Sequence, residues 1–251
     1  MNIRMIVTDL DSTLLRDDKT VSERTIATLV ACRKKDVKVV YATARGSSAK
    51  KLLPPNLFDG FVRMGGAAAF AGDDQFYSKL ISTADARALL LAADNAGIKM
   101  AAELENLHYA NFNTAEVWDW LTYYEIADFG ALDIRAEKMY ALPETQAEID
   151  LLRNHLPKGL NMIVDRNMFT MFMNEDATKA KALAALANHW NIDRTDIVAF
   201  GDDTNDVDML VYAGHGVAMG NAVAEARAVA DEVCDTNEND GLARWIEENI
   251  L

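Results

Sequence analysis

The sequence predicts a doubly wound, Rossmann-like α/β core with a parallel sheet, into which a second domain of the α+β class is inserted. Strands and helices alternate over the first 65 residues, as they do in parallel sheets. The same alternation returns near residue 177 and continues through the rest of the sequence. The residues between mix helices and strands in a different order. We therefore expect a core of residues 1–80 and 174–251 and an inserted domain of residues 81–173.

The N-terminal part of the predicted core holds three strands and one helix. Residues 3–8 are a short β-branched run and form the first strand. A helix begins at Ser22, which can cap its N-terminus. Residues 37–42 and 61–64 form the next two strands, and each runs into a turn that contains glycine.

The remaining elements follow from the same hydrophobic periodicity. In the C-terminal part of the core we expect a helix (177–190), a strand (196–200), a helix (203–212), a strand (215–219) and two helices (222–230 and 238–249). In the inserted domain we expect a helix (83–96), a strand (98–103), a helix (115–127), a strand (137–142), a helix (144–155) and two strands (160–164 and 168–173).

Aromatic residues crowd the predicted helix 115–127, among them Trp118, Trp120 and Tyr124. They either pack the inserted domain or line a substrate pocket, because aromatic faces suit sugar rings. Packing is the interpretation favoured for Trp118, and the others stay open.

Composition and charge exclude several classes of protein. The formal net charge is −14, so the chain repels nucleic acid and anionic membranes. No apolar run approaches the roughly 18 residues of a membrane-spanning helix, and the N-terminal residues lack the apolar stretch of a secretory signal. The two cysteines, Cys32 and Cys234, stand in no paired motif. We expect a cytoplasmic protein that binds neither nucleic acid nor membrane.

An acid pair follows the first predicted strand directly. Asp9 and Asp11 stand two residues apart in DLDST. In a parallel sheet the carboxyl ends of the strands face the ligand crevice, so one acid can attack as a nucleophile while the other handles protons. The alternative is two solvated turn residues, because Asp is a common turn former.

An acid cluster follows the predicted strand 196–200, in the run GDDTND. Asp202 or Asp203 alone could cap the following helix. The further polar residues Asn205 and Asp206 exceed what a cap requires. Oxygen ligands in this number suit Mg²⁺.

A hydroxyl and two cations complete the candidate site. Thr43 ends the second predicted strand, and its hydroxyl with adjoining backbone N–H groups could bind a phosphoryl oxygen. Arg45 could assist or could pair with a neighbouring acid. Lys179 begins a helix, where a cation opposes the helix dipole and so indicates another role; the alternative is an exposed lysine, as expected for Lys181.

Together these residues resemble the four motifs of the haloacid dehalogenase superfamily, and within it the Cof-like sugar phosphatases with a large cap of type C2. DLDSTLL is similar to motif one, ATAR to motif two and GDDTNDVDML to motif four, while Lys179 stands at motif three. The segments 213–222 and 239–248 also look like this family. The chain departs from the family at Ser12, where Gly is usual, and at Gly65, where Asn is usual.

The resemblance implies a magnesium-dependent phosphatase that acts on a small phosphorylated metabolite. Asp9 would form a phosphoaspartate, and Asp11 would act as acid and base. The implied Mg²⁺ ligands are the carboxylates of Asp9 and Asp202 and the backbone carbonyl of Asp11.

Further residues have supporting roles by the same resemblance. The implied phosphate-binding residues are Thr43, Ala44, Lys179 and Asn205, and the implied supporting residues are Thr13, Arg45, Asp203 and Asp206. Asp11 needs a proton near neutral pH, and burial beside other carboxylates is expected to raise its pKa while Mg²⁺ opposes that rise.

Two alternatives remain open from the sequence. A phosphomutase uses the same acid pair and returns the phosphoryl group to a sugar. A receiver-like signalling module carries a phosphorylated aspartate that a partner reads, although it needs neither Asp11 nor a large inserted cap.

Overall fold

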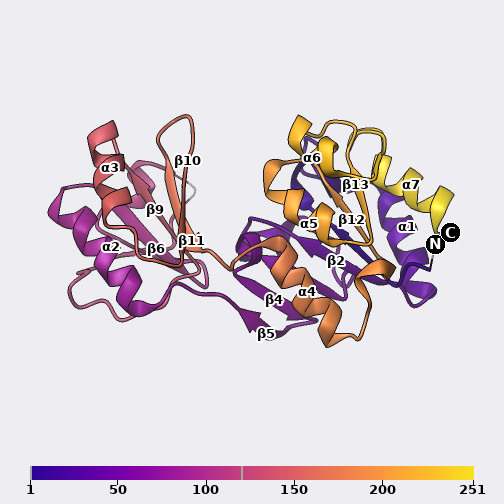
Figure 1. Ribbon diagram of the computed structural model, residues 1–251, viewed down its shortest axis with the longest axis horizontal. Helices are drawn as coiled ribbons and strands as arrows, with labels where there is room; N and C mark the ends of the chain where they lie inside the picture. The colour runs from indigo at the N-terminus through magenta and orange to yellow at the C-terminus, as the bar shows by residue number, and fades with distance from the viewer. Residues whose placement is uncertain (1, 120) are drawn as a thin grey trace. The chain divides into compact units, whose positions relative to one another are not determined.

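Two sheets organise the chain, one in each of two units, in the computed structural model, which describes residues 2–119 and 121–251 (Figure 1). Unit 1 comprises Met1–Ser78 and Thr178–Leu251, and unit 2 comprises Lys79–Ala177. Unit 2 is therefore an insertion in the sequence of unit 1. The units divide a few residues from the boundaries expected at residues 80 and 173.

The sheet of unit 1 has eight strands in the order β14-β13-β12-β1-β2-β3-β4-β5. They are β1 (Met5–Thr8), β2 (Lys38–Ala42), β3 (Gly60–Arg63), β4 (Ala68–Ala71), β5 (Asp74–Ser78), β12 (Ile197–Gly201), β13 (His215–Ala218) and β14 (Glu232–Val233). The pairs from β14 to β3 are parallel, and β4 and β5 are added antiparallel. The predicted doubly wound α/β fold with a mainly parallel sheet is confirmed.

Helices cover both sides of this sheet (Figure 1). They are α1 (Glu23–Lys34), α4 (Lys179–His189), α5 (Val207–Tyr212), α6 (Ala224–Val229) and α7 (Gly241–Asn249). Helix α1 packs against α7, and α4 packs against α5. Ser22 caps α1 as predicted, since its side chain accepts a hydrogen bond from the N–H of Thr25.

The central strand β1 positions the functional end of unit 1. All four of its residues are buried, and it lies between β2 and β12. These three neighbouring strands run parallel, so the residues that follow each one meet at the same edge. Those residues are Asp9, Thr43 and Asp202, which makes this edge the candidate site.

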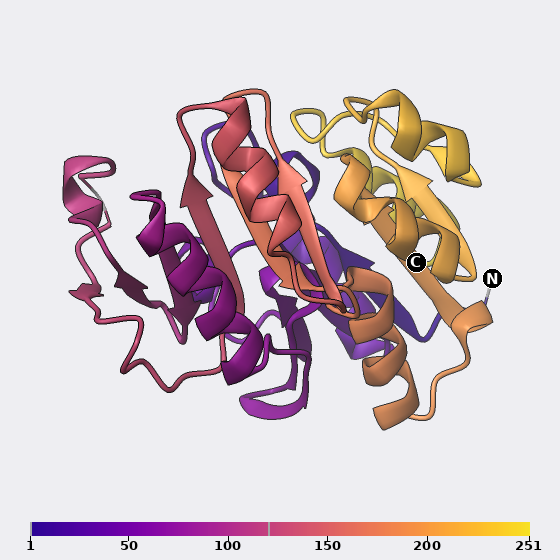
Figure 2. The same ribbon diagram turned by 60° about the vertical axis from the view of Figure 1, so that its left-hand side comes forward.

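The sheet of unit 2 has six strands in the order β10-β11-β9-β6-β7-β8. They are β6 (Lys99–Leu104), β7 (Leu107–Ala110), β8 (Tyr124–Ile126), β9 (Lys138–Leu142), β10 (Leu160–Val164) and β11 (Thr170–Asn174). Helices α2 (Thr83–Asn95) and α3 (Gln146–Asn154) lie side by side in front of these strands in Figure 2. Leu89 of α2 and Leu152 of α3 share one apolar cluster with Met139 of β9. We call the opposite side of this sheet the helix-free face, because neither of these two helices packs there.

The prediction of a helix over residues 115–127 is wrong. In its described part the chain forms a short 3₁₀ turn, Thr114–Glu116, and then strand β8, which pairs parallel with β7. The Thr114 hydroxyl donates a 3.0 Å hydrogen bond to the carbonyl of Leu121, which fixes a local loop in place of a helix. Trp120, which was assigned to this helix, lies outside the described residues.

Five of the described strands were not predicted, namely β4, β5, β7, β8 and β14. The predicted helix over 203–212 also divides, because Thr204–Asp206 form a separate 3₁₀ turn before α5. Among the described residues no helix is both long and apolar enough to span a membrane.

Candidate active site

Asp9 is a buried carboxylate at the end of β1. Its backbone N–H donates to the carbonyl of Phe200, which continues the pairing with β12, and only 6% of the residue is exposed. Burial raises the pKa of Asp9 to about 7, and the nearby carboxylates of Asp206 and Asp202 add to the rise while Lys179 opposes it. Asp9 is thus a poorly solvated carboxylate held beside a cation.

Lys179 lies at the first position of α4 and is 1% exposed. Its ammonium group donates to Asp9 Oδ1 at 2.6 Å, Asp206 Oδ1 at 2.6 Å and Asn205 Oδ1 at 3.2 Å, which matches its three protons. Burial alone would lower the pKa of Lys179, but the two carboxylates raise it above its usual value, so the side chain stays charged. The exposed lysine considered as an alternative is therefore ruled out.

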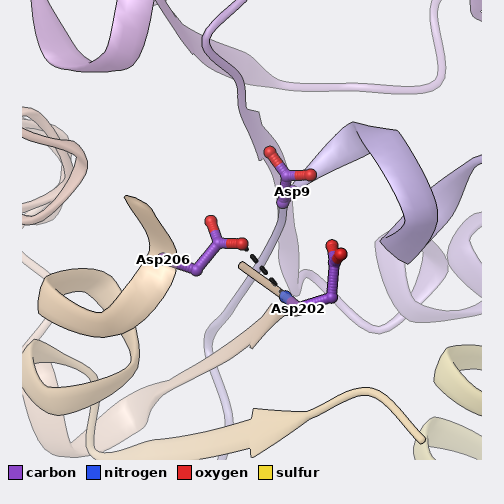
Figure 3. A group of neighbouring side chains, drawn as sticks. All are labelled: Asp9, Asp202 and Asp206. Carbon is purple, nitrogen blue, oxygen red and sulfur yellow. Dashed lines mark hydrogen bonds between the residues drawn. The ribbon is translucent and has the colours of Figure 1, made fainter. Parts of the chain in front are cut away.

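Asp202 and Thr13 join two segments that are 189 residues apart. The Thr13 hydroxyl donates to Asp202 Oδ1 at 2.6 Å. Burial raises the pKa of Asp202 to about 6, and the hydrogen bond from Thr13 opposes this rise. Figure 3 shows the Asp9 and Asp202 carboxylates with Asp206 beside them.

Asp206 holds the acid cluster together through hydrogen bonds from three groups. Its Oδ2 accepts hydrogen bonds from the backbone N–H groups of Asp202 (3.0 Å) and Asp203 (3.1 Å), while its Oδ1 accepts from Lys179. Gly201 makes room for it, because a Cβ there would lie 2.5 Å from the Asp206 Cβ. Asp203 caps the turn by accepting from the N–H of Thr204, and it is exposed.

The carboxylates of Asp9, Asp202 and Asp206 offer oxygens that lie within 4.8 Å of one another, which fits a single metal ion. Oxygen donors of this kind suit Mg²⁺. Both Asp206 oxygens accept hydrogen bonds, whereas the hydrogen bonds described for the Asp9 and Asp202 carboxylates use Oδ1 of each. The donor set therefore fits a divalent cation best at Asp9 and Asp202.

The expectation that the pKa of Asp11 is raised is wrong. Its carboxylate is paired with the Arg45 guanidinium at 2.6 and 2.7 Å and with the Lys19 ammonium at 2.9 Å. These partners lower its pKa to about 2, led by the hydrogen bonds from Arg45. The side chain is 37% exposed and lies beside cations rather than buried among acids, which explains the opposite shift. Lys19 was not identified from the sequence.

Thr43 is buried at the end of β2, and its hydroxyl oxygen accepts a 3.1 Å hydrogen bond from the N–H of Arg45. That bond uses a lone pair and leaves the hydroxyl proton to be donated elsewhere. Ala44 is exposed between them. The pairing considered for Arg45 with a neighbouring acid is present, with Asp11 as the acid.

Two asparagines support the turn that carries Asp11. Ser12 has a left-handed backbone (φ 59°), and its carbonyl accepts from Asn221 Nδ2 at 2.8 Å. Asn221 Oδ1 in turn accepts from the N–H of Asn237, and the Asn237 amide donates to the carbonyl of Leu15. The sequence placed Asn221 in a family-like segment without assigning it a role, and it did not single out Asn237.

Hydrogen bonds thus connect most of the predicted site residues. Lys179 connects Asp9, Asn205 and Asp206; Asp206 connects to Asp202 and Asp203; and Asp202 connects to Thr13. A second group consists of Asp11, Arg45 and Thr43. One edge of the sheet thus holds a buried carboxylate, a fixed cation and an acid cluster that can bind a metal ion. Together these groups can support nucleophilic attack on an anionic ester, because the carboxylate can attack while the cations stabilise negative charge.

Known proteins are similar to this chain in sequence and in fold. The family model described as haloacid dehalogenase-like hydrolase matches residues 6–246. A 5-amino-6-(5-phospho-D-ribitylamino)uracil phosphatase of Bacillus subtilis is 26% identical over 97% of this chain and 96% of its own length.

Two solved structures are similar over nearly the whole chain. A phosphatase of the haloalkanoate superfamily from Bacteroides thetaiotaomicron has a TM-score of 0.82 and 26% identity, covering 98% of this chain and 94% of its own. A subclass IIB sugar phosphatase of the same superfamily has a TM-score of 0.79 and 25% identity, covering 98% of both chains.

Proposed function

The chain belongs to the haloacid dehalogenase-like hydrolases, and from this premise we propose that it is a magnesium-dependent phosphatase. Its substrates would be small phosphate monoesters, namely sugar phosphates or related metabolites, and its intermediate a phosphoaspartate on Asp9. The observation that carries the proposal is the contact of buried Asp9 with Lys179 at 2.6 Å, beside the Asp202 carboxylate.

The proposed reaction has two steps at Asp9. A carboxylate oxygen of Asp9 bonds to phosphorus as the bond from phosphorus to the substrate alcohol breaks, and the alcohol oxygen takes a proton from Asp11. Water then attacks the phosphoaspartate and gives its proton to Asp11. Inorganic phosphate leaves and the Asp9 carboxylate is restored.

Fixed groups stabilise the charge that spreads over the phosphoryl oxygens. Lys179 is held in place by Asp206 and Asn205, so it needs no reorganisation during the reaction. Thr43 has a hydroxyl proton to donate. Mg²⁺, when bound by the Asp9 and Asp202 carboxylates and the Asp11 backbone carbonyl, would offset the repulsion between carboxylate and phosphate.

Asp11 must exchange partners to fill its proposed role. While Arg45 and Lys19 contact both of its oxygens, Asp11 stays ionised and cannot donate a proton. An incoming phosphate is a stronger attractant for Arg45, because guanidinium groups bind phosphate through paired hydrogen bonds. We propose that substrate binding draws Arg45 away and frees Asp11.

The inserted unit 2 is proposed to select substrates, since its insertion separates Thr43 from Lys179 in the chain. Two of the relatives named above support this choice of substrate class, since one is named as a phosphatase of a phosphorylated ribitylamino-uracil and the other as a sugar phosphatase.

Substitution of Asp9 by Asn tests the nucleophile. Asn has nearly the same shape and retains an acceptor for Lys179, so the fold should survive while turnover falls more than about 100-fold, or about 2.7 kcal/mol. Release of inorganic phosphate measures turnover and separates a phosphatase from a phosphomutase. Asp196→Asn, at the opposite end of β12, is the matched control and should keep its rate. Retention of more than about a hundredth of the rate by Asp9→Asn would contradict the assignment.

A further inference from the structure

The turn that follows β13, residues 219–223, contacts the loops that carry Asp11 and Asp202. The N–H of Val223 donates a 2.8 Å hydrogen bond to the carbonyl of Asp202. On the other side, Asn221 Nδ2 donates a 2.8 Å hydrogen bond to the carbonyl of Ser12, the residue next to Asp11. This one turn therefore links the backbone that carries Asp202 to the backbone that carries Asp11.

The side-chain amide of Asn221 is held at both ends. Its Nδ2 donates to the Ser12 carbonyl, and its Oδ1 accepts a 3.1 Å hydrogen bond from the backbone N–H of Asn237. Because one partner is a carbonyl and the other is an N–H group, the opposite orientation of the amide would lose both bonds. Asn221 thus presents a fixed donor to the loop of Asp11, although the residue itself is exposed.

Asn237 anchors this arrangement and is buried, with 6% of the residue exposed. Its amide donates at 3.1 Å to the carbonyl of Leu15 and at 3.1 Å to Asp17 Oδ1. Its segment packs closely against the turn, because a Cβ on Gly220 would lie 2.9 Å from the carbonyl carbon of Asp235. The loop after β1 is therefore held at two backbone carbonyl groups.

The hydrogen bond from Asn221 acts where the backbone is strained. Ser12 has a left-handed backbone (φ 59°), and Asp11 before it is extended (φ −71°, ψ 125°). A left-handed backbone is unfavourable in a residue other than glycine, and it persists where surrounding contacts hold it. Since the Asn221 bond is such a contact, we expect its loss to let the loop relax and to displace the Asp11 carboxylate.

The proposed reaction needs a contact that holds Asp11 through its backbone. In the free protein the Asp11 carboxylate is fixed by Arg45 and Lys19, which contact its oxygens. Those contacts end when Asp11 turns to the alcohol oxygen of the substrate. From then on the position of the carboxylate depends on its backbone, on which the Asn221 bond acts.

We propose that Asn221 is a positioning residue for proton transfer. By holding the Ser12 carbonyl, it keeps Asp11 within reach of the leaving alcohol in the first step and of water in the second. Asn237 sets the orientation of Asn221. The inference rests on the proposed phosphatase function and adds two residues that act through the backbone of the loop after β1.

Esters with different leaving groups test this role. Nitrophenolate leaves p-nitrophenyl phosphate without a proton, whereas a sugar alkoxide must receive one, so only the sugar ester needs an acid in the first step. Asn221→Asp keeps the shape of the side chain and the acceptor for Asn237, and it places an oxygen against the Ser12 carbonyl. Asn221→Ala removes the same bond without adding a charge.

The test compares kcat/KM for p-nitrophenyl phosphate and for the sugar ester that the unaltered protein hydrolyses fastest among glucose 6-phosphate, ribose 5-phosphate and erythrose 4-phosphate. Both variants should lower kcat/KM for the sugar ester at least about tenfold and for p-nitrophenyl phosphate less than about threefold. The ratio of two esters in one preparation does not depend on the folded fraction, so a loss of stability alone leaves it unchanged.

The second step gives an independent reading, because hydrolysis of the phosphoaspartate is the same for every ester. A displaced Asp11 activates water poorly, so the phosphoaspartate should accumulate in Asn221→Asp. For p-nitrophenyl phosphate, kcat and KM should therefore fall together.

Asn239→Asp is the matched control, because it adds the same charge in the segment of Asn237. Asn239 is exposed, and its amide donates to Asp235 rather than to the loop after β1. It should keep both rates within about twofold. Equal losses for the two esters in the Asn221 variants, or no loss for either, would overturn the inference and leave the proposed function intact. If the unaltered protein releases phosphate from none of the sugar esters, the proposed function fails instead.

Discussion

At the scale of single residues, the ammonium group of Lys179 is the point on which the acid cluster depends. It is the cation in direct contact with the buried carboxylates of Asp9 and Asp206, each at 2.6 Å. Removing one partner of a buried ionic group leaves the other charges uncompensated, which costs about 3–5 kcal/mol.

We therefore expect Lys179→Ala to lose both catalysis and stability. Turnover should fall more than about 100-fold, because the phosphoryl oxygens lose a fixed cation. Chemical denaturation should show a fall in the free energy of unfolding of about 3–5 kcal/mol. Phosphate release and urea unfolding measure the two effects.

Lys181→Ala is the matched control, since Lys181 lies two positions further along α4, on a different side of the helix, and is exposed. It should change neither quantity by more than a small amount. Equal losses in the two variants would contradict the assignment of Lys179.

Residue types and spacing predicted which side chains gather at the site, but not all of their contacts. Asp9 and Asp202 could be identified because each follows a buried strand, and parallel strand ends converge. The state of Asp11 could not be predicted, because it depends first on its pairing with Arg45, which the sequence left open, and then on Lys19, which the sequence did not identify.

At the scale of elements, hydrophobic periodicity predicted the helices that bury one face, and it missed several short strands, among them the edge strands β8 and β14. The helices α1 and α4 were predicted because their apolar residues recur with helical spacing. Strands β8 and β14 have three and two residues, too few for an alternating pattern, and both lie at sheet edges. The segment 115–127 was assigned a helix, yet it is rich in aromatic residues, which favour strands.

The turn after β3 offers a prediction for a backbone contact. Gly66 has φ +116°, and a Cβ there would lie 2.2 Å from the carbonyl oxygen of Thr178. Gly66→Ala should lower the free energy of unfolding by more than about 2 kcal/mol. It should also lower kcat, because Thr178 adjoins Lys179. Urea unfolding and phosphate release give the two values.

Gly72→Ala separates the clash from the backbone strain. Gly72 also has a positive φ (+60°), but a Cβ there meets nothing within 4 Å. Its cost should be about 1 kcal/mol, with unchanged turnover. If the free energy of unfolding falls equally in both variants, the close approach of Gly66 to Thr178 does not contribute to stability.

At the scale of the whole molecule, the negative charge of the chain and its acid cluster both favour the binding of a cation. The formal net charge is −14, and Asp9 and Asp202 bring two carboxylates together at the edge of one sheet. An ion that binds the folded state and not the unfolded state raises the midpoint of thermal unfolding.

We expect millimolar Mg²⁺ to raise the thermal midpoint and to be required for turnover, with both effects lost in EDTA. Metal binding needs ionised carboxylates, and the pKa values of Asp9 and Asp202 are about 7 and about 6 in the metal-free protein. Protons therefore compete with the ion as the pH falls. The increase in the midpoint should be larger at pH 8 than at pH 5.5, which scanning calorimetry can measure.

Ca²⁺ should also raise the midpoint but inhibit turnover in competition with Mg²⁺, because it favours bidentate carboxylates and would engage both oxygens of Asp9. Asp202→Ala should abolish both increases. Full turnover in EDTA, or equal turnover with Ca²⁺, would remove the metal from the proposed mechanism.

The place where unit 2 joins the chain has an evolutionary consequence. Its first and last residues are tied to each other, since the Asn174 amide donates to the carbonyl of Leu80 at 3.2 Å and Lys79 pairs with Asp176. A segment whose ends meet can be exchanged for another, longer or shorter, without altering the register of the strands that precede and follow it. Recombination at this junction could therefore replace the whole segment from Lys79 to Ala177 in one event, while Asp9, Lys179 and Asp202 are inherited unchanged. Descendants of such an ancestor would diversify in the molecules they accept faster than in the chemistry they perform.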